Sequence, residues 1–192
     1  MVHSSRLPKG TTRSQALAML SDYEFFLSCD PHLDKFESIP NPETELNPPP
    51  TLPDSVKSQL RHPPPSQSSP PEAASDSAPT PVCYRVTDIV HAIPAGIWDT
   101  NVVSTYEFTD IRDGVFVRIR SPLSIVMDTF WEVREVDGEG EDQGLELVED
   151  LTIRCSRLLV GIVKGQCEDG WERIHAKMIA RLEREVKGEG QG

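Results

Sequence analysis

Basic residues are scarce in this sequence of 192 residues. It has 19 Lys and Arg against 31 Asp and Glu, so the formal net charge is −12. The acidic residues are dispersed along the chain, and a field of this sign repels nucleic acid and anionic membrane surfaces. A nucleic-acid partner is therefore disfavoured.

Long apolar runs are absent as well. No window approaches the roughly 18 consecutive apolar residues that a membrane-spanning helix needs. Residues 1–10 contain no apolar core of the secretory type. The sequence therefore predicts a soluble, cytoplasmic protein without integral membrane insertion.

Cysteine is rare, and its spacing matches no common metal site. Cys29, Cys83, Cys155 and Cys167 are far apart, without a CxxC motif or paired Cys/His spacing, which argues against structural zinc. We expect reduced, mostly buried thiols and no bound metal. The GxGxxG, P-loop, HExxH and GxSxG motifs are also missing, so nucleotide cofactors and the common hydrolase mechanisms lack support and no cofactor is expected.

Proline is concentrated in one part of the chain. Of the 17 prolines, 12 fall between Pro42 and Pro81, in a stretch with few large apolar residues. Such a stretch buries too little apolar surface to offset the entropy of ordering it. We interpret residues 44–80 as a disordered Pro/Ser-rich insertion, for which a partner domain that binds proline-rich segments is one candidate role. Residues 1–43 and 81–187 then form one domain, and residues 188–192 a tail.

Apolar residues recur with helical spacing near both ends of the chain. A capping box from Thr12 to Gln15 precedes a predicted helix over residues 13–28. A longer apolar stripe predicts a helix from about 156 to 186. Alternation of apolar and polar residues predicts strands over residues 3–8, 32–39, 82–90, 101–110, 115–120, 125–136 and 145–153.

This order of elements predicts an α+β fold. A short N-terminal strand, a helical segment, a run of antiparallel strands and one long amphipathic helix suit a helix-grip arrangement, in which a curved antiparallel sheet wraps around the C-terminal helix. Arg112-Asp113-Gly114 supplies positive-φ turn chemistry for one hairpin. Arg118 and Arg120 share a strand face that we expect to be a solvated exterior.

Two carboxylates are candidates for acid–base chemistry. The strand phase places Glu149 among Leu147, Leu151 and Ile153, and a carboxylate on an apolar cavity wall has a raised pKa. The alternative is that a bulge or an edge position exposes Glu149. Asp88 could orient a ligand hydroxyl, or it could bond backbone amides in a turn.

Ten other residues are candidates for ligand binding because their strand or helix phase points them inward. They combine hydroxyl groups that could hold a polar group of the ligand with apolar and aromatic walls. An ordinary filled core would use the same residue types. The ten are Tyr84, Ser104, Tyr106, Met127, Thr129, Trp131, Leu147, Leu151, Trp171 and Met178.

A nucleophilic pair of Cys167 and His175 is also conceivable on the long helix. Two helical turns separate these residues, so their side chains would not touch easily. We therefore do not expect thiol catalysis.

Several short segments resemble a known family. They are Tyr84-Arg-Val-Thr-Asp88 with Ile93-Pro-Ala-Gly96, Tyr106-Glu-Phe-Thr-Asp110 with Asp113-Gly114, Val148-Glu-Asp-Leu-Thr-Ile-Arg-Cys155, and Leu7-Pro8-Lys9-Gly10-Thr11. With these segments the chain resembles a family of uncharacterised fungal proteins in the START-like, polyketide-cyclase-like (SRPBCC) superfamily. The resemblance implies a cavity between sheet and helix that takes lipids, sterols, polyketides or other apolar molecules, and it carries over no catalytic signature.

Three functions follow as expectations. The first is binding of a hydrophobic small molecule, such as a lipid or a polyketide-like secondary metabolite, in the sheet and helix cavity. The second is a cofactor-free cyclase or dehydratase in which Glu149, Asp88 or a tyrosine transfers protons. The third is a protein-interaction module whose core is filled by side chains. Fold alone does not decide among them.

Overall fold

The computed structural model of the chain describes residues 1–61, 80–91, 99–136 and 144–189. Within them a seven-stranded antiparallel sheet forms with the strand order β1-β7-β6-β5-β4-β3-β2. Its strands are β1 (Val2–Arg6), β2 (Leu33–Ile39), β3 (Val82–His91), β4 (Asp99–Ile111), β5 (Gly114–Ser121), β6 (Ile125–Val136) and β7 (Gly144–Arg154). The predicted strands are all present, with bounds that differ by a few residues.

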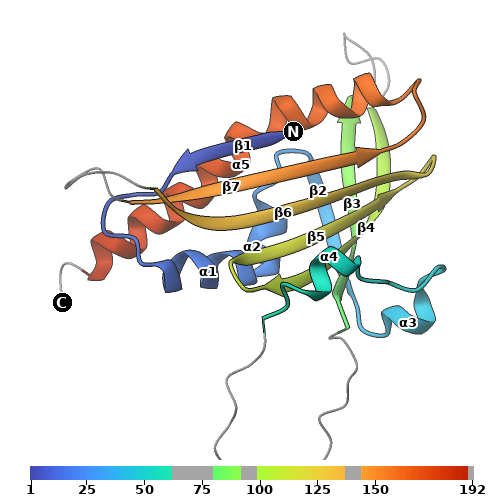
Figure 1. The fold of residues 1–192 in the computed structure, drawn as a ribbon. Helices are drawn as coiled ribbons and strands as arrows, with labels where there is room; N and C mark the ends of the chain where they lie inside the picture. Colours follow the sequence, from blue (N-terminus) through green and yellow to red (C-terminus); the bar gives the residue numbers. More distant parts are fainter. Residues whose placement is uncertain (62–79, 92–98, 137–143, 190–192) are drawn as a thin grey trace, which may run out of the picture.

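One long helix packs against the curved face of this sheet. Figure 1 shows α5 (Val160–Glu189) running behind β7 and β1, and α1 (Arg13–Ser21) and α2 (Tyr23–Ser28) lying beside it. Two short helices, α3 (Pro42–Glu45) and α4 (Asp54–Lys57), lie toward the other side. The α+β fold with a sheet and a long C-terminal helix is therefore confirmed.

The predicted helix over residues 13–28 is two helices that meet at Asp22. The capping box of Thr12 and Gln15 is present at the start of α1. The Asp22 amide donates to the Met19 carbonyl at 3.3 Å, while its carboxylate accepts from the Phe25 amide at 3.2 Å. One residue thus ends α1 and caps α2. The apolar periodicity continues across the break because both helices bury apolar residues in the same core cluster.

Gly114 is required for a reason other than the predicted one. Among the described glycines only Gly10 has a positive φ, of 89°. A Cβ on Gly114 would lie 1.8 Å from the Trp131 carbonyl oxygen. Close approach of β5 to β6, and not turn geometry, therefore excludes a side chain here.

The main core lies between the sheet and the helices α1, α2 and α5. Residues with large apolar or aromatic side chains from all of these elements form one buried cluster. Inward strand positions and one helix stripe meet there because the strand period is two and the helix period is 3.6. Its fully buried members include Met19, Leu20, Val115, Leu147, Met178 and Leu182.

The outer face of the sheet is also covered, by part of the proline-rich segment. Val56 of α4 is fully buried against Ile111 and Phe116, and Leu60 forms a β-bridge with Ile111. The prediction that disorder begins at residue 44 is thus wrong for residues 44–61, because the few apolar residues there find a second cluster. Residues 62–79 lie outside the described part of the chain.

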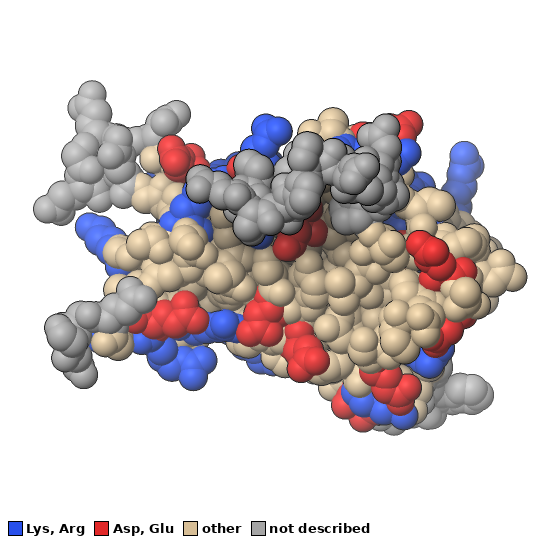
Figure 2. Space-filling model, turned by 90° about the horizontal axis from the view of Figure 1, so that it is seen from below, with Lys and Arg blue, Asp and Glu red and all other residues tan. Residues whose placement is uncertain are grey.

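Charges of both signs occur on the surface. Figure 2 shows Lys and Arg beside Asp and Glu around an area of uncharged residues, on the face seen from below the view of Figure 1. In the described residues no helix is both long and apolar enough to cross a membrane.

Candidate functional site

A cavity of about 170 Å³ lies between the sheet and the first half of α5. Residues of α2, the following turn, strands β3 to β7 and α5 line it, and most of their side chains are apolar. The lining consists of Phe26, Asp30, His32, Asp88, Tyr106, Val117, Ile119, Met127, Thr129, Trp131, Glu149, Leu151, Val163, Gln166, Cys167, Gly170, Trp171 and Ile174. A cavity of roughly 150 Å³ accepts benzene in another protein, so this one suits a ligand of about one ring.

The structure brings eight of the twelve candidate residues together around this cavity. These eight are Asp88, Tyr106, Met127, Thr129, Trp131, Glu149, Leu151 and Trp171. Cross-strand register explains the grouping, since Val117, Thr129 and Leu151 are direct neighbours across β5, β6 and β7.

The other four candidates do not line the cavity. Tyr84 packs edge-on against Phe36 and Phe108, and the Ser104 hydroxyl lies 2.8 Å from that of Ser121. Leu147 and Met178 are fully buried in the main core. Their inward phase was correct, but other side chains fill the space around them.

Glu149 lies on the cavity wall and has a partner from the N-terminal strand. It is 8 % exposed, so the alternative of an exposed edge position is wrong. His3 is directly opposite it on β1, with Nδ1 3.0 Å from Oε2, and the His3 ring stacks on Trp171 at 4.7 Å. Burial raises the pKa of Glu149, while the His3 hydrogen bond and the N-terminal ammonium partly offset the rise.

Asp88 lies on β3, which is four strands away from β7 in the sheet, and it lines the same cavity as Glu149. It sits within a strand pair, opposite Val102 of β4, and not in a turn. Its Oδ1 atom is buried and has no hydrogen-bond partner among the described residues. Burial, with a smaller contribution from the charge of Asp30, raises the pKa of Asp88 to about 7. Asp88 can therefore gain or lose a proton near neutral pH.

Tyr106 brings a phenol to the same side of the cavity. Burial raises its pKa well above the usual value, and the charges of Asp88 and Asp30 add to the rise. Its residue is 8 % exposed. No partner for its hydroxyl is found in the described part of the chain, so this group faces the cavity without a hydrogen bond to protein.

The two residues of the conceivable nucleophilic pair have separate partners. Cys167 lies 4.0 Å from the sulfur of Met127, and burial raises its pKa to about 12. The His175 Nδ1 atom is 2.8 Å from the Ser5 hydroxyl, and burial lowers its pKa to about 4. A protonated thiol and a distant neutral imidazole do not make a nucleophile.

Gly170 shapes the cavity from the helix side. It lines the space, and a Cβ built on it meets no atom within 4 Å. A glycine within a helix costs about 1 kcal/mol relative to alanine. The absence of a side chain at position 170 leaves space between α5 and the sheet.

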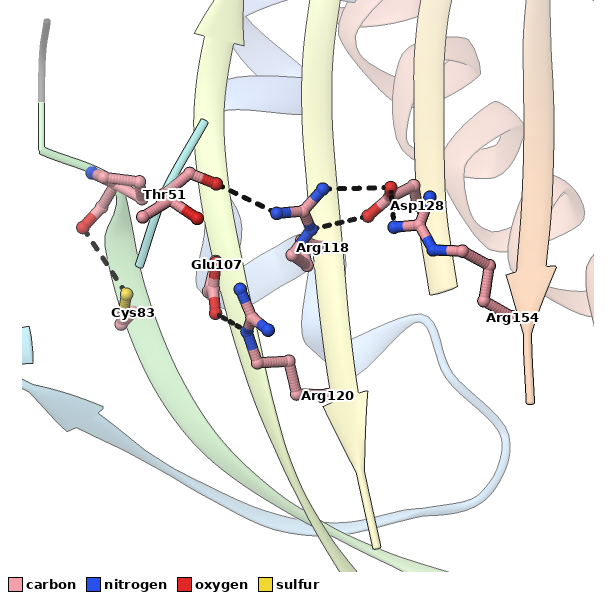
Figure 3. Close-up of polar contacts among 8 residues, drawn as sticks. Thr51, Cys83, Glu107, Arg118, Arg120, Asp128 and Arg154 are labelled. Carbon is pink, nitrogen blue, oxygen red and sulfur yellow. Dashed lines mark hydrogen bonds and ion pairs between the residues drawn. The ribbon is translucent and has the colours of Figure 1, made fainter. Parts of the chain in front are cut away.

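The outer face carries an ion-pair network that the sequence analysis missed. Arg118 donates to both carboxylate oxygens of Asp128 at 2.7 and 3.0 Å and to the Thr51 carbonyl at 2.9 Å. Arg154 also donates to Asp128, and Arg120 donates to Glu107 (Figure 3). Burial raises the pKa of Asp128, but the hydrogen bonds and charges of Arg118 and Arg154 outweigh this effect and lower the pKa.

The expected solvated exterior is therefore wrong for Arg118, which is 8 % exposed. The segment that contains Thr51 folds over this strand face and removes the guanidinium from water. Asp128 supplies the opposite charge on the neighbouring strand, because the two residues are register partners. The network holds β5 to β6 and does not touch the cavity.

Sequence reasoning also missed two polar residues of the cavity. Asp30 and His32 come from the turn after α2, where the His32 amide donates to Asp30 at 2.8 Å. An Asp-Pro pair after a helix signals a turn, but nothing in it signals a cavity. His3 alternates with Ser5 on β1, and only the pairing of β1 with β7 reveals its partner.

The described residues contain no group of three or more His, Cys, Asp or Glu placed to hold a metal ion. All four cysteines are free, as predicted. Cys29 and Cys83 are buried, whereas Cys155 and Cys167 are partly buried. The polar groups of the cavity are three carboxylates, a phenol, an imidazole, a thiol, a hydroxyl and an amide.

A family model described as a domain of unknown function, DUF7053, matches residues 1–184. The chain belongs to this family. The match spans the sheet, the outer covering segment and nearly all of α5, so the cavity lies wholly within the DUF7053 domain. No curated protein matches the chain.

Proposed function

We propose that this DUF7053 protein binds a small, mainly apolar molecule in the cavity between its sheet and α5. The observation that carries the proposal is an unfilled space of about 170 Å³ with apolar walls and a few polar groups directed into it. Binding sites for small molecules have this composition. The space favours this function over an interaction module with a filled core.

The volume of the cavity limits the size of the ligand. Pockets for drug-sized molecules occupy roughly 300–1,000 Å³, which is well above this volume. A whole sterol or long polyketide exceeds this volume. The resemblance to the START-like superfamily supports an apolar ligand, and the volume limits it to about one ring or a short chain.

Acid–base catalysis in the same cavity is the second candidate function. Asp88 supports it, since a pKa of about 7 suits proton transfer near neutral pH. Glu149 is less suited because His3 already holds it. Once a ligand is known, its conversion by the wild type but not by Asp88→Asn, with binding kept, would favour a cofactor-free enzyme. Recovery of unchanged ligand would favour a binding protein.

The experiment that tests the proposal blocks the cavity from the helix side. Gly170→Leu places a side chain in the cavity, and the control Gly161→Leu adds the same side chain to an exposed part of α5 where a Cβ also meets nothing. Toluene and benzyl alcohol serve as probes in thermal denaturation. A ligand at a hundredfold excess over Kd stabilises by about 2.7 kcal/mol, which corresponds to a rise in Tm of roughly 5–10 °C.

We expect the rise in the wild type and in Gly161→Leu, and no rise in Gly170→Leu. An equal rise in all three proteins would place binding outside the cavity and contradict the proposal. Failure of both probes to shift the wild type, together with native mass spectra that show no co-purifying molecule from the natural source, would also contradict it.

A further inference from the structure

Acidic groups outnumber basic ones inside the cavity. Asp30, Asp88 and Glu149 line it, and none of its described lining residues is Lys or Arg. Glu149 has His3 and the N-terminal ammonium as positive neighbours. Neither Asp30 nor Asp88 forms an ion pair with any residue that the structure describes. The side of the cavity formed by these two residues is therefore the electronegative one.

The same side carries acceptors that lack donors. Asp88 Oδ1 is buried without a partner among the described residues. The Tyr106 hydroxyl, on a residue more than nine-tenths buried, also has none there and lines the cavity. Asp88, Asp30 and Tyr106 all line the cavity, and the charges of the two carboxylates both act on the Tyr106 phenol. A buried carboxylate oxygen without a donor, such as Asp88 Oδ1, is rare in proteins and points to a bound group.

We propose that the cavity takes a small apolar amine, with its ammonium group beside Asp88, Asp30 and Tyr106. This inference rests on the proposed binding function and names the class of ligand. An ammonium group has three N–H donors and a positive charge. It would donate to the acceptors and relieve the repulsion between the two carboxylates. An alcohol would donate to the acceptors but leave the repulsion, and a carboxylate would neither donate nor relieve the repulsion.

The apolar walls of the cavity suit the apolar portion of such a ligand. Ile119, Met127 and Trp131 present aliphatic and aromatic surface to it. The volume of about 170 Å³ leaves room for one ring with a short aminoalkyl group.

Three probes with the same ring separate the effect of charge from that of size. Benzylamine is a cation at pH 7.5, benzyl alcohol is neutral and benzoate is an anion. Titration calorimetry should give affinities in that order, with benzylamine at least about tenfold tighter than benzyl alcohol, because hydrogen bonds to charged groups are the stronger ones.

Asp88→Asn tests where the ammonium group binds. We expect it to weaken benzylamine about tenfold and to change benzyl alcohol less than threefold. Asp34→Asn is the matched control, since it removes the same charge from an exposed position on β2 and should change neither affinity. Gly170→Leu should abolish binding of both probes, which separates the cavity from adventitious binding to an acidic surface.

The outcomes distinguish the two proposals. If benzyl alcohol binds in the cavity as tightly as benzylamine, the amine inference is wrong and the binding function stands. If Asp88→Asn leaves benzylamine unchanged while Glu149→Gln weakens it, the assigned position of the ammonium is wrong. If no probe binds the wild type and native mass spectra show no co-purifying molecule, the proposed function itself fails.

Discussion

Asp88→Asn should stabilise the protein at high pH and have little effect at low pH. The pKa of Asp88 rises from 3.8 to about 7 on folding, which corresponds to about 4 kcal/mol of preference for the neutral form. The folded state then holds more protons than the unfolded state between pH 4 and 7, so the stability of the wild type falls as the pH rises through that range. The isosteric amide carries no such charge.

Urea denaturation at several pH values between 4 and 8.5, followed by tryptophan fluorescence, measures this difference. The free energy of unfolding of Asp88→Asn minus that of the wild type should be near zero at pH 4. This difference should grow by about 4 kcal/mol up to pH 7 and then stay constant. This magnitude is an upper value because Asp88 is only partly buried. His175, with its pKa of about 4, affects both proteins equally and cancels.

Asp34→Asn controls for the loss of one negative charge from a protein of net charge −12. A difference between Asp88→Asn and wild type that is constant within 0.5 kcal/mol from pH 4 to 8.5 would refute the reasoning. It would mean that Asp88 gains no proton affinity on folding.

Three further experiments test other parts of the structure. Gly114→Ala should destabilise by roughly 1–3 kcal/mol because its Cβ meets the Trp131 carbonyl, and a neutral effect in urea denaturation would contradict this packing. Arg118→Met should cost about 3 kcal/mol, since it leaves Asp128 buried with Arg154 alone; a cost below 1 kcal/mol would show that the network is not buried. A thiol reagent should titrate four cysteines in denatured, unreduced protein, and a count of two would disprove the free thiols.

Local patterns were enough to predict the strands and the long helix. Alternation along residues 101–136 identifies β4 to β6 because inward and outward positions differ in polarity there. The same phase argument placed Glu149 and Tyr106 at the cavity. It could not tell a lining residue from a filled core, as Tyr84 illustrates, because periodicity gives a direction and not the space in front of a side chain.

Contacts between distant segments lay beyond the sequence. His3 reaches Glu149 only because β1 pairs with β7, 146 residues away along the chain. Arg118 is buried only because the segment around Thr51 returns across the sheet. Proline content led to the prediction of disorder in that segment, because composition does not reveal that α4 and its neighbours cover an outer strand face.

Strands β4, β5 and β6 carry the cavity wall on their inner face and the ion-pair network on their outer face. Inner and outer residues alternate along each of them, as in Tyr106-Glu107, Val117-Arg118-Ile119 and Met127-Asp128-Thr129. The network therefore cross-links the back of the wall and resists separation of β5 from β6. The helix side has fewer constraints, since Gly161 and Gly165 of α5 meet no neighbouring atoms at the Cβ position. We expect ligand exchange to proceed by displacement of the first turns of α5, while the sheet keeps its shape.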